Sequence, residues 1–596
     1  MPRIAANDNR IPAGELKNGV LELRLELSTA VWYPEDEAAG RVEVYAFGEE
    51  GRAPQIPGPL IRVPQGTQIH IRIHNTLPLA AKIYGLHQRP GDSKDTLSVA
   101  PGETREVRFL AGEPGTYIYT AATSDKVLAD RDPRDKMLSG AFVVDAPQAK
   151  PDDRIFVIGL WTRTSPGVFD EIAAMNGKAW PYTEHLTLKQ GEPVHWRVVN
   201  TTEFDHAMHL HGFYFKVDGV GDGERYERYP EDQRRVVVTE HVDDGHVFEM
   251  TFAPDRPGNW LFHCHMVVHM SPSEFLHPKR AEPASYSPEH QHGAGMGGLV
   301  LGITVLPDAS AAPVAAAAKE ARKLQLVISE NPAKVPFYTL EVNDPKLPAT
   351  AAPNKDKPPS LLGPPIILTR GETTEIEVKN QTTGPTAIHW HGMELESYYD
   401  GVAGWTGSGQ QTTPPIAPGL SFIARMTPPR AGTFIYHTHW HDDRQILNGV
   451  YGPLIVLEPG GKYDPEHERT IVLSMGKYPP FGFILLVNGH PQPDPIELHA
   501  GTPYRLRLIN ITDNAADLRV RLTSNDAPVQ WKVLAKDGAD LPPAQLKSTT
   551  AEMGITVGET YDVEYQADKP GVAELKIWET SFPSSVTLPL QFVAAK

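Results

Sequence analysis

The sequence is poor in cysteine, in long apolar runs and in clustered basic residues, and each shortage excludes a class of protein. Its one cysteine, Cys264, excludes an intrachain disulfide and is either a small buried side chain or a reactive one. Apolar runs never reach the roughly 18 residues of a membrane-spanning helix. The formal net charge of -18, without a Lys/Arg-rich run, disfavours nucleic acid and anionic membranes as partners.

The N-terminal segment lacks the features of an export signal. MPRIAANDNRIPAG contains neither an apolar signal core nor a twin-arginine pair. The chain as written is therefore expected to stay in the cytoplasm, and a trimmed N-terminus would instead indicate a periplasmic protein.

The abundant residues favour an all-β protein of several domains. A chain of 596 residues is too long for one ordinary domain. Its 50 glycines and 56 prolines are scattered between short runs of alternating or β-branched residues, such as residues 69–73, 375–378 and 505–509. This texture is typical of β-sandwiches.

Two segments of the sequence are each repeated once. Residues 58–147 and 363–459 share a GP-strand-glycine pattern, an APG turn and the similar strands GTYIYTAAT and GTFIYHTHW. Residues 175–200 and 487–510 begin a second pair of copies, which later share RPG and KPG. Because the copies alternate, we expect four tandem Greek-key β-sandwich domains. The predicted boundaries are 1–147, 148–306, a linker at 307–322, 323–459 and 460–596.

Ten of the 24 histidines form four tight clusters. HWH begins at His389 and HTH at His437, both in the second copy of the first repeat. HAMHLH begins at His206 and HCHMVVH at His263, so Cys264 lies inside the densest cluster. Since residues i and i+2 of a strand share one face, each HxH pair directs two imidazoles the same way.

The other copies serve as an internal control, because they lack these histidines. The first domain aligns Tyr84, Leu86, Thr120 and Ala122 with His389, His391, His437 and His439. The last domain aligns Ala516, Arg519 and Arg521 with the HAMHLH histidines, and Lys576, Ile577 and Trp578 with HCH. The fold therefore does not need the clusters, and imidazole with thiolate suits copper or zinc. Ten histidines and a cysteine exceed the four ligands of one zinc site.

Taken together, HWHG, HTH, HxxHLHG and HCHxxxH make the sequence resemble the multicopper oxidases, the family of laccases and ceruloplasmin. The resemblance covers nearly the whole chain as cupredoxin-like domains, of which only the middle two carry ligands. It implies four copper ions: one type 1, one type 2 and a type 3 pair. It also implies one-electron oxidation of a small reducing substrate, coupled to the four-electron reduction of dioxygen to water.

Carried over position by position, the resemblance assigns a ligand set to each copper. The type 1 ion would take His206, Cys264 and His269, and the type 2 ion would take His209 and His389. One type 3 ion would take His391, His437 and His265, and the other His439, His211 and His263. Electrons would enter through an exposed edge of His269 or His206 and pass along Cys264 to His263 and His265.

The axial ligand of the type 1 copper departs from the family pattern. Glu274 occupies the usual position, and a carboxylate suits it poorly. Our hypothesis is that Met296 is axial, behind an insertion at residues 270–292; the alternatives are Met270 or no ligand at all. The insertion is either a substrate-gating loop with a weak extra metal site or a solvated excursion, and it carries His277, Glu282, Tyr286, Glu289, His290 and His292.

Proton supply also departs from the pattern. Asp400 matches the family's acid beside the type 2 copper and is expected to relay protons or orient a ligand. The acid often found within HCHxxxH is missing, because Val267 and Val268 are apolar. Asp205 is either its substitute or a surface residue, and His441 is expected beside the ligands.

The electron donor is the least determined feature. A phenol or an aromatic amine, as in laccases, is the first expectation. Cu(I) or Fe(II) is the alternative, although the 12 methionines are not grouped as a cuprous site would favour. A copper protein that only transfers electrons is a remote third possibility, since it needs no more than the type 1 ligands. The sequence does not define the oligomeric state.

Overall fold

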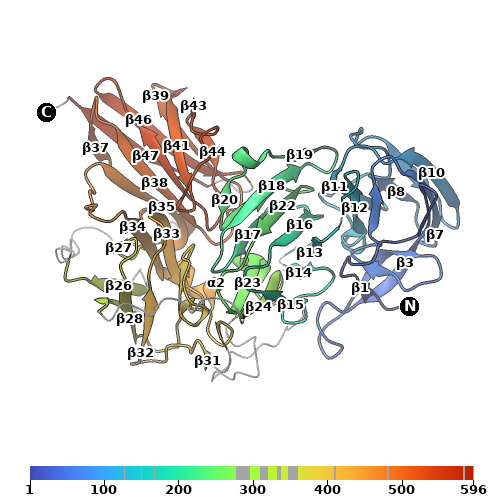
Figure 1. Cartoon of the computed structure of the whole chain (residues 1–596), viewed down its shortest axis with the longest axis horizontal. Coiled ribbons are helices and arrows are strands. Elements are labelled where there is room, and N and C mark those ends of the chain that lie inside the picture. The colour runs from blue at the N-terminus through green and yellow to red at the C-terminus, as the bar shows by residue number, and fades with distance from the viewer. Residues whose placement is uncertain are drawn as a thin grey trace.

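Strands make up nearly all the regular structure of the computed structural model (Figure 1). The structure describes residues 1–126, 128–149, 151–166, 168–276, 295–308, 320–331, 337–346, 360–408, 411–478, 482–580 and 584–594. In these residues the α-helices are single turns, α1 (Val267–Met270) and α2 (Asp442–Gln445). The 3₁₀ turns are equally short: Pro133–Asp135, Glu231–Gln233, Ser397–Tyr399 and Ile446–Asn448. The predicted all-β class is confirmed.

The strands form sheets that follow one another in pairs, and we call each pair a sandwich. The first sandwich, residues 5–145, has one sheet of β1 (Ala5–Ala6), β5 (Gln55–Ile56), β4 (Val42–Glu49), β3 (Val20–Trp32), β7 (Gln68–Asn75) and β10 (Thr104–Leu110), with β2 (Glu15–Lys17) beside β3. Its other sheet holds β6 (Ile61–Pro64), β12 (Ser139–Asp145), β11 (Gly115–Ala122), β8 (Ala81–Tyr84) and β9 (Thr96–Val99).

The fourth sandwich, residues 468–593, is built in the same manner. One sheet holds β36 (Gly482–Val487), β35 (Glu468–Tyr478), β38 (Tyr504–Ile511), β45 (Thr560–Tyr565), β41 (Gln530–Lys536), β42 (Ala539–Asp540) and β43 (Ser548–Thr550). The other holds β37 (Ile496–His499), β47 (Ser585–Val593), β46 (Gly571–Glu579), β39 (Leu518–Ser524), β40 (Ala527–Pro528) and β44 (Glu552–Gly554).

The second sandwich, residues 154–306, carries half of the histidine clusters. One sheet holds β14 (Val168–Met175), β13 (Arg154–Ser165), β16 (Val194–Asn200), β22 (Val247–Phe252), β18 (Phe215–Gly221), β19 (Tyr226–Arg228) and β20 (Val236–Val237). The other holds β15 (His185–Lys189), β24 (Val300–Leu306), β23 (Gly258–Cys264), β17 (His206–Leu210) and β21 (Thr239–Val242).

The third sandwich, residues 322–457, carries the other half. One sheet holds β26 (Tyr338–Asn343), β25 (Arg322–Glu330), β28 (Thr374–Gln381) and β32 (Ser421–Met426). The other holds β27 (Ile366–Thr369), β34 (Tyr451–Leu457), β33 (Gly432–Thr438) and β29 (Ile388–His391). The hairpin β30 (Gly407–Ser408) and β31 (Gln411–Thr412) leaves it and joins the second sandwich, where Gly407 pairs with Asn259 of β23.

A buried asparagine recurs in all four sandwiches and shows why the repeats fold alike. Asn75, Asn200, Asn380 and Asn510 are each 0% exposed at or near the end of a central strand. Each side-chain amide donates to backbone carbonyls of a neighbouring loop, as Asn75 does to Val99 and Asn380 to Ile416. An amide that satisfies buried carbonyls fixes the loop to the strand.

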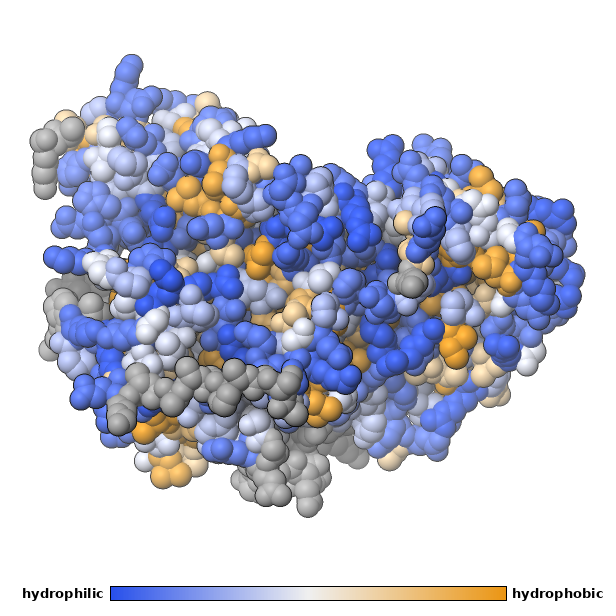
Figure 2. All heavy atoms as spheres, in the orientation of Figure 1, coloured by the Kyte–Doolittle hydropathy of each residue, from blue (hydrophilic) through white to orange (hydrophobic). Residues whose placement is uncertain are grey.

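The second sandwich lies in the middle of the molecule (Figure 1), with the first on one side and the third and fourth on the other. The face drawn in Figure 2 is largely hydrophilic, with apolar residues in small scattered groups. No helix among the described residues is long and apolar enough to cross a membrane.

Candidate metal centre

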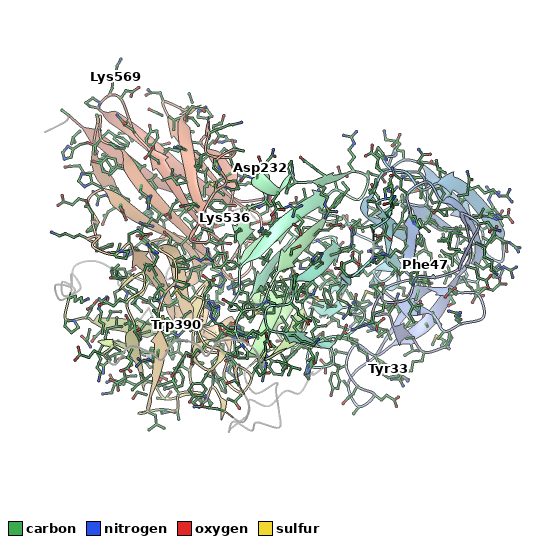
Figure 3. The ribbon with its side chains drawn as sticks, in the orientation of Figure 1. Tyr33, Phe47, Asp232, Trp390, Lys536 and Lys569 are labelled. Atoms are coloured by element: carbon green, nitrogen blue, oxygen red, sulfur yellow. The ribbon has the colours of Figure 1, made fainter. Side chains whose placement is uncertain are left out.

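Strand pairing brings the four histidine clusters together. His209 pairs with His263 across β17 and β23, and His389 pairs with His437 across β29 and β33. Trp390 points into the core of the third sandwich (Figure 3), so its neighbours His389 and His391 point to the opposite face. Cys264 likewise lies in the core of the second sandwich, so the predicted parity is realised for His389 and His391 and for His263 and His265.

One group of three residues matches the predicted type 1 ligands, and we call it the type 1 group. The Sγ atom of Cys264 lies 3.6 Å from Nδ1 of His206 and 3.6 Å from Nδ1 of His269. His206 and His269 are only 0% and 2% exposed. The expectation of an exposed histidine edge was therefore wrong, because Phe204 packs on the ring of His269 and the hydroxyl of Thr202 contacts Nε2 of His206.

The other eight histidines converge on a second site, which we call the trinuclear group. Its subsets with ligand atoms within 4.8 Å of one another are His265, His391 and His437; His211, His263 and His439; and His209, His211 and His389. The first two are the predicted type 3 triads, and the third contains the predicted type 2 pair. The second and third sandwiches each supply four of these side chains.

The hydrogen bonds of the histidine rings show which ring nitrogens of the trinuclear group remain available to bind a metal ion. Nδ1 of His209, His389 and His437 contacts the carbonyl oxygen of Val238, Asp400 and Thr438, respectively, at 2.6–2.9 Å. The Nε2 atoms of the same rings are buried without a hydrogen-bond partner, and so are both nitrogens of His265 and His439. Buried imidazole nitrogens without partners are costly unless a metal binds them. Together with the thiolate-containing type 1 group, this pattern is consistent with one type 1 copper and a trinuclear copper centre.

Burial also sets the protonation states that ligation requires. It lowers the pKa of His263 and His437 to about 4 and that of His269 to about 3, which keeps these imidazoles neutral near pH 7. The same burial raises the pKa of the Cys264 thiol to about 12 in the metal-free chain. A copper ion would therefore displace the thiol proton on binding.

Asp400 contacts two of the predicted ligands. Its Oδ2 lies 2.8 Å from Nδ1 of His211, and its backbone oxygen lies 2.8 Å from Nδ1 of His389. The carboxyl is 0% exposed, and burial raises its pKa well above the usual range. These contacts orient His211 and His389, as expected of a residue behind the ligands.

Two methionines are candidates for the axial ligand of the type 1 group. Met270 and Met296 are both buried in one apolar cluster with Trp180 and Trp440. The backbone after Met296 returns to His269, because Leu299 N donates to His269 O and Gly297 N donates to Met270 O. The chain therefore comes back to the type 1 group after the insertion, as the hypothesis for Met296 requires. Glu274, which occupies the family's usual axial position in the sequence, is exposed. Which methionine is axial stays a prediction.

Residues 277–294, which include most of the insertion predicted at 270–292, lie outside the described residues. The histidines and acids proposed there, His277, Glu282, Tyr286, Glu289, His290 and His292, therefore stay untested. The described flanks, Glu274 and Gly295, line a cavity of about 970 Å³ that His441 also lines.

The pairing of residues between strands tests the alignment of the ligand-bearing copies with the copies that lack the histidines. Tyr84 pairs with Thr120 just as His389 pairs with His437, which confirms that alignment. In the fourth sandwich Arg521, not Arg519, pairs with Lys576 as His209 pairs with His263. The alignment of Ala516, Arg519 and Arg521 was therefore wrong by two residues, because the segment between Asn510 and β39 is longer than that between Asn200 and β17.

Several neighbours of the site were not found from the sequence. Glu171 Oε1 lies 3.9 Å from Nε2 of His269, and the hydroxyl of Thr239 contacts both His209 and His391. Gly558 of the fourth sandwich lies against His265 and His391. These residues sit in ordinary strand and turn patterns, so the sequence carried no signal for them. Asp205 is half-buried and lies 3.4 Å from His241, in a group with Asp243.

Comparisons with known proteins agree with the geometry. A family model described as "Multicopper oxidase" matches residues 51–149 and 359–461, and a second with the same description matches residues 157–274. Laccase-3 of Thanatephorus cucumeris is 26% identical over 243 residues, 35% of this chain and 40% of that protein. Copper resistance protein A of Pseudomonas syringae pv. tomato is 37% identical over 110 residues, 18% of this chain and 17% of that protein. The chain thus matches less than half the length of either relative.

Among solved structures, the multicopper oxidase from Campylobacter jejuni titled "a metallo-oxidase" is 16% identical, with a TM-score of 0.34. The match covers 77% of this chain and 98% of that one. The blue copper oxidase from Nitrosomonas europaea is 23% identical over 46% of this chain and 86% of that chain, with a TM-score of 0.36.

Proposed function

The chain belongs to the multicopper oxidase family, and from this premise we propose that it is a laccase-type oxidase. It would take single electrons from a phenolic or aromatic-amine donor and reduce dioxygen to water. The observation that carries the proposal is the convergence of ten buried histidines and one cysteine on two adjoining groups. A protein that only transfers electrons would leave eight of those histidines unexplained.

Copper bound in these groups would supply the redox chemistry, with single-electron transfer at the type 1 group and dioxygen reduction at the trinuclear group. The chain contributes the connection between them, because Cys264 is bonded through the backbone to His263 and His265. These two histidines belong to the two different predicted type 3 triads. Asp400 contributes the fixed orientation of His211 and His389.

The cavity of about 970 Å³ is the proposed donor site, because two of its lining residues, Glu171 and Gly298, lie next to His269. Gly298 lines it, and a Cβ atom on Gly298 would meet the carbonyl oxygen of His269 at 2.2 Å. Glu171 also lines it, close to the same ring. Phe169 and Val268, 57% and 44% exposed, offer apolar contacts to an aromatic ring.

The charge of this cavity favours cationic donors. Its described lining includes one guanidinium, Arg444, and the acidic side chains Glu35, Asp170, Glu274, Asp443 and Asp513. Glu171 also lines it, but burial raises the pKa of Glu171 to about 8, so its side chain is mostly neutral near pH 7. Acidic walls raise the local concentration of cations. They disfavour anionic aromatic donors but do not separate phenols from aromatic amines, which are both largely neutral near pH 7. They support the second candidate function, oxidation of a metal ion such as Fe(II) or Cu(I).

Copper analysis and oxygen uptake test the proposal together. We expect about four copper ions per chain. Oxygen uptake should be compared for an aromatic diamine, a neutral phenol, an aromatic carboxylic acid, Fe(II) and Cu(I). The diamine should exceed the acid, and Cys264→Ser should lose the blue absorption and the uptake. One copper per chain, or no uptake with any donor, would refute the oxidase; faster uptake with Fe(II) or Cu(I) than with the diamine would favour the metal-ion function.

A further inference from the structure

The fourth sandwich lacks copper ligands but forms a wall of the trinuclear group. A Cβ atom on Gly558 would lie 2.9 Å from Cδ2 of His265 and 3.1 Å from Cε1 of His391. Its neighbour Val557 is buried in the core of the second sandwich. The turn at residues 556–559 therefore lies directly behind one predicted type 3 triad.

A hydroxyl group joins this turn to two of the ligands. The Oγ1 atom of Thr239 lies 3.2 Å from Nδ1 of His209, 3.3 Å from Nε2 of His391 and 3.4 Å from the carbonyl oxygen of Gly558. Thr239 is 0% exposed. A polar contact therefore leads from the turn to both predicted copper types of the trinuclear group.

On its other side the turn faces a cavity of about 400 Å³ between the second and fourth sandwiches. Thr556 and Glu559, the two ends of the turn, both line this cavity. Thr556 is 2% exposed, and its hydroxyl has no hydrogen-bond partner among the described residues. A buried hydroxyl of this kind in a cavity of this size is a site for water.

Glu559 carries a carboxylate at the point where the cavity and the turn meet. Its Oε2 accepts a hydrogen bond of 2.9 Å from Thr556 N, and its Oε1 lies 2.6 Å from Nζ of Lys536. Figure 3 shows Lys536 where the fourth sandwich meets the second. Lys536 is shared with Glu240, 3.1 Å away, and Glu240 also pairs with Arg235. Among the ion pairs of the described residues, Glu559 therefore has one cationic partner, Lys536, which it shares with Glu240, whereas Glu240 has two, Lys536 and Arg235.

Reduction of dioxygen requires protons as well as electrons. Each dioxygen that becomes two waters takes up four electrons, which come from the donor, and four protons, which come from solvent. The eight histidines of the trinuclear group are at most 3% exposed. Protons therefore need a route through the protein wall.

We propose that Glu559 is the proton-transfer residue of this wall, taking protons from water in the cavity and passing them, by way of water, past the Gly558 turn to the trinuclear group. The inference rests on the proposed oxidase function. In each transfer the carboxylate of Glu559 accepts a proton that solvent supplies through the cavity water and releases it to the next water inward, so Glu559 and the waters are both restored and the net proton comes from solvent. The charged and titratable groups nearest to it are Lys536, Asp537, Tyr561, Glu240, His241 and Arg235. The same cavity is also lined by Tyr229, Asp243, His246, Asp517 and Arg519.

Glu559→Gln tests the proposal, because glutamine retains an oxygen acceptor for Thr556 N, but its amide cannot take up and release a proton near neutral pH. The variant should keep wild-type copper content, blue absorption and anaerobic bleaching of the blue copper by the donor. Reoxidation of the reduced protein by dioxygen should slow roughly tenfold or more, with a larger solvent isotope effect and a steeper loss of rate at high pH. Glu559→Asp should recover part of the rate.

The matched control is Glu468→Gln, which removes a carboxylate paired with the buried Arg507 of the same sandwich. It should lower thermal stability without slowing reoxidation. Wild-type reoxidation and isotope effect in a copper-loaded Glu559→Gln would overturn the proposal. If Glu559→Gln loses copper, a loaded Glu559→Asp with a wild-type pH profile would overturn it equally. Failure of the wild type to reoxidise would instead refute the oxidase function itself.

Discussion

Three histidines of the metal centre each use one ring nitrogen for a contact with the protein and leave the other available to a metal ion. His209, His389 and His437 each commit Nδ1 to a backbone carbonyl and leave Nε2 free and buried. The identity of these ligands could be predicted, because HxH parity and the absent counterparts in the other copies are sequence properties. The division of nitrogens could not, because it depends on which carbonyl each ring meets in the folded chain: that of the adjacent Thr438 for His437, but those of Asp400 and Val238 for His389 and His209.

The axial ligand yields a test on two neighbouring methionines. Met296→Leu should raise the reduction potential of the type 1 copper and shift its blue absorption, because a weak axial thioether tunes both. Leucine nearly conserves the volume, so the fold should tolerate it, at a cost below about 1.5 kcal/mol. Redox titration and absorption spectra provide the measurement. Met270→Leu, in the same apolar cluster, is the control; an effect there alone would make Met270 the ligand.

Individual strands and turns mark the limit of what the sequence could predict. The ligand-bearing strands were predictable because the strand patterns around the histidines recur in the copies that lack them, as GTYIYTAAT and GTFIYHTHW do. The two-residue error in aligning β39 arose because an asparagine anchors each copy while the following loop varies in length. The role of residues 556–559 was also not predictable, because a turn of the fourth sandwich meets histidines of the second and third only in the folded chain.

The Gly558 turn yields a steric test. Gly558→Ala should push on His265 and His391 and lower the copper content of the trinuclear group, while the blue type 1 absorption remains. Metal analysis and electron paramagnetic resonance provide the measurement. Gly501→Ala is the control, since Gly501 has φ +82° against +83° for Gly558 but no neighbour within 4 Å of an added Cβ. Both variants share the backbone strain of about 1–2 kcal/mol; equal copper loss in both would show that strain alone is responsible.

Across the whole molecule, the metal centre lies at the junction of three sandwiches. The second and third each contribute four histidines to the trinuclear group, and the fourth covers it with Gly558. Direct contacts also join the second and third, where Ser397 donates to Asn259 O at 2.6 Å and Trp405 donates to Trp260 O at 2.9 Å. Copper would therefore add to an existing interface, and its removal should weaken that interface without abolishing it.

Removing copper tests this arrangement. The metal-free protein leaves buried nitrogens of His209, His265, His389, His391, His437 and His439 without partners, at a cost of roughly 1–3 kcal/mol for each group left unsatisfied. Because copper binds the folded state, its removal should lower the main calorimetric transition by several degrees. The first sandwich contributes none of these groups, so a transition assigned to it by limited proteolysis should not move. Reloading with Cu(I) should restore the original profile, and an unchanged profile after complete copper removal would contradict a stabilising role for the metal.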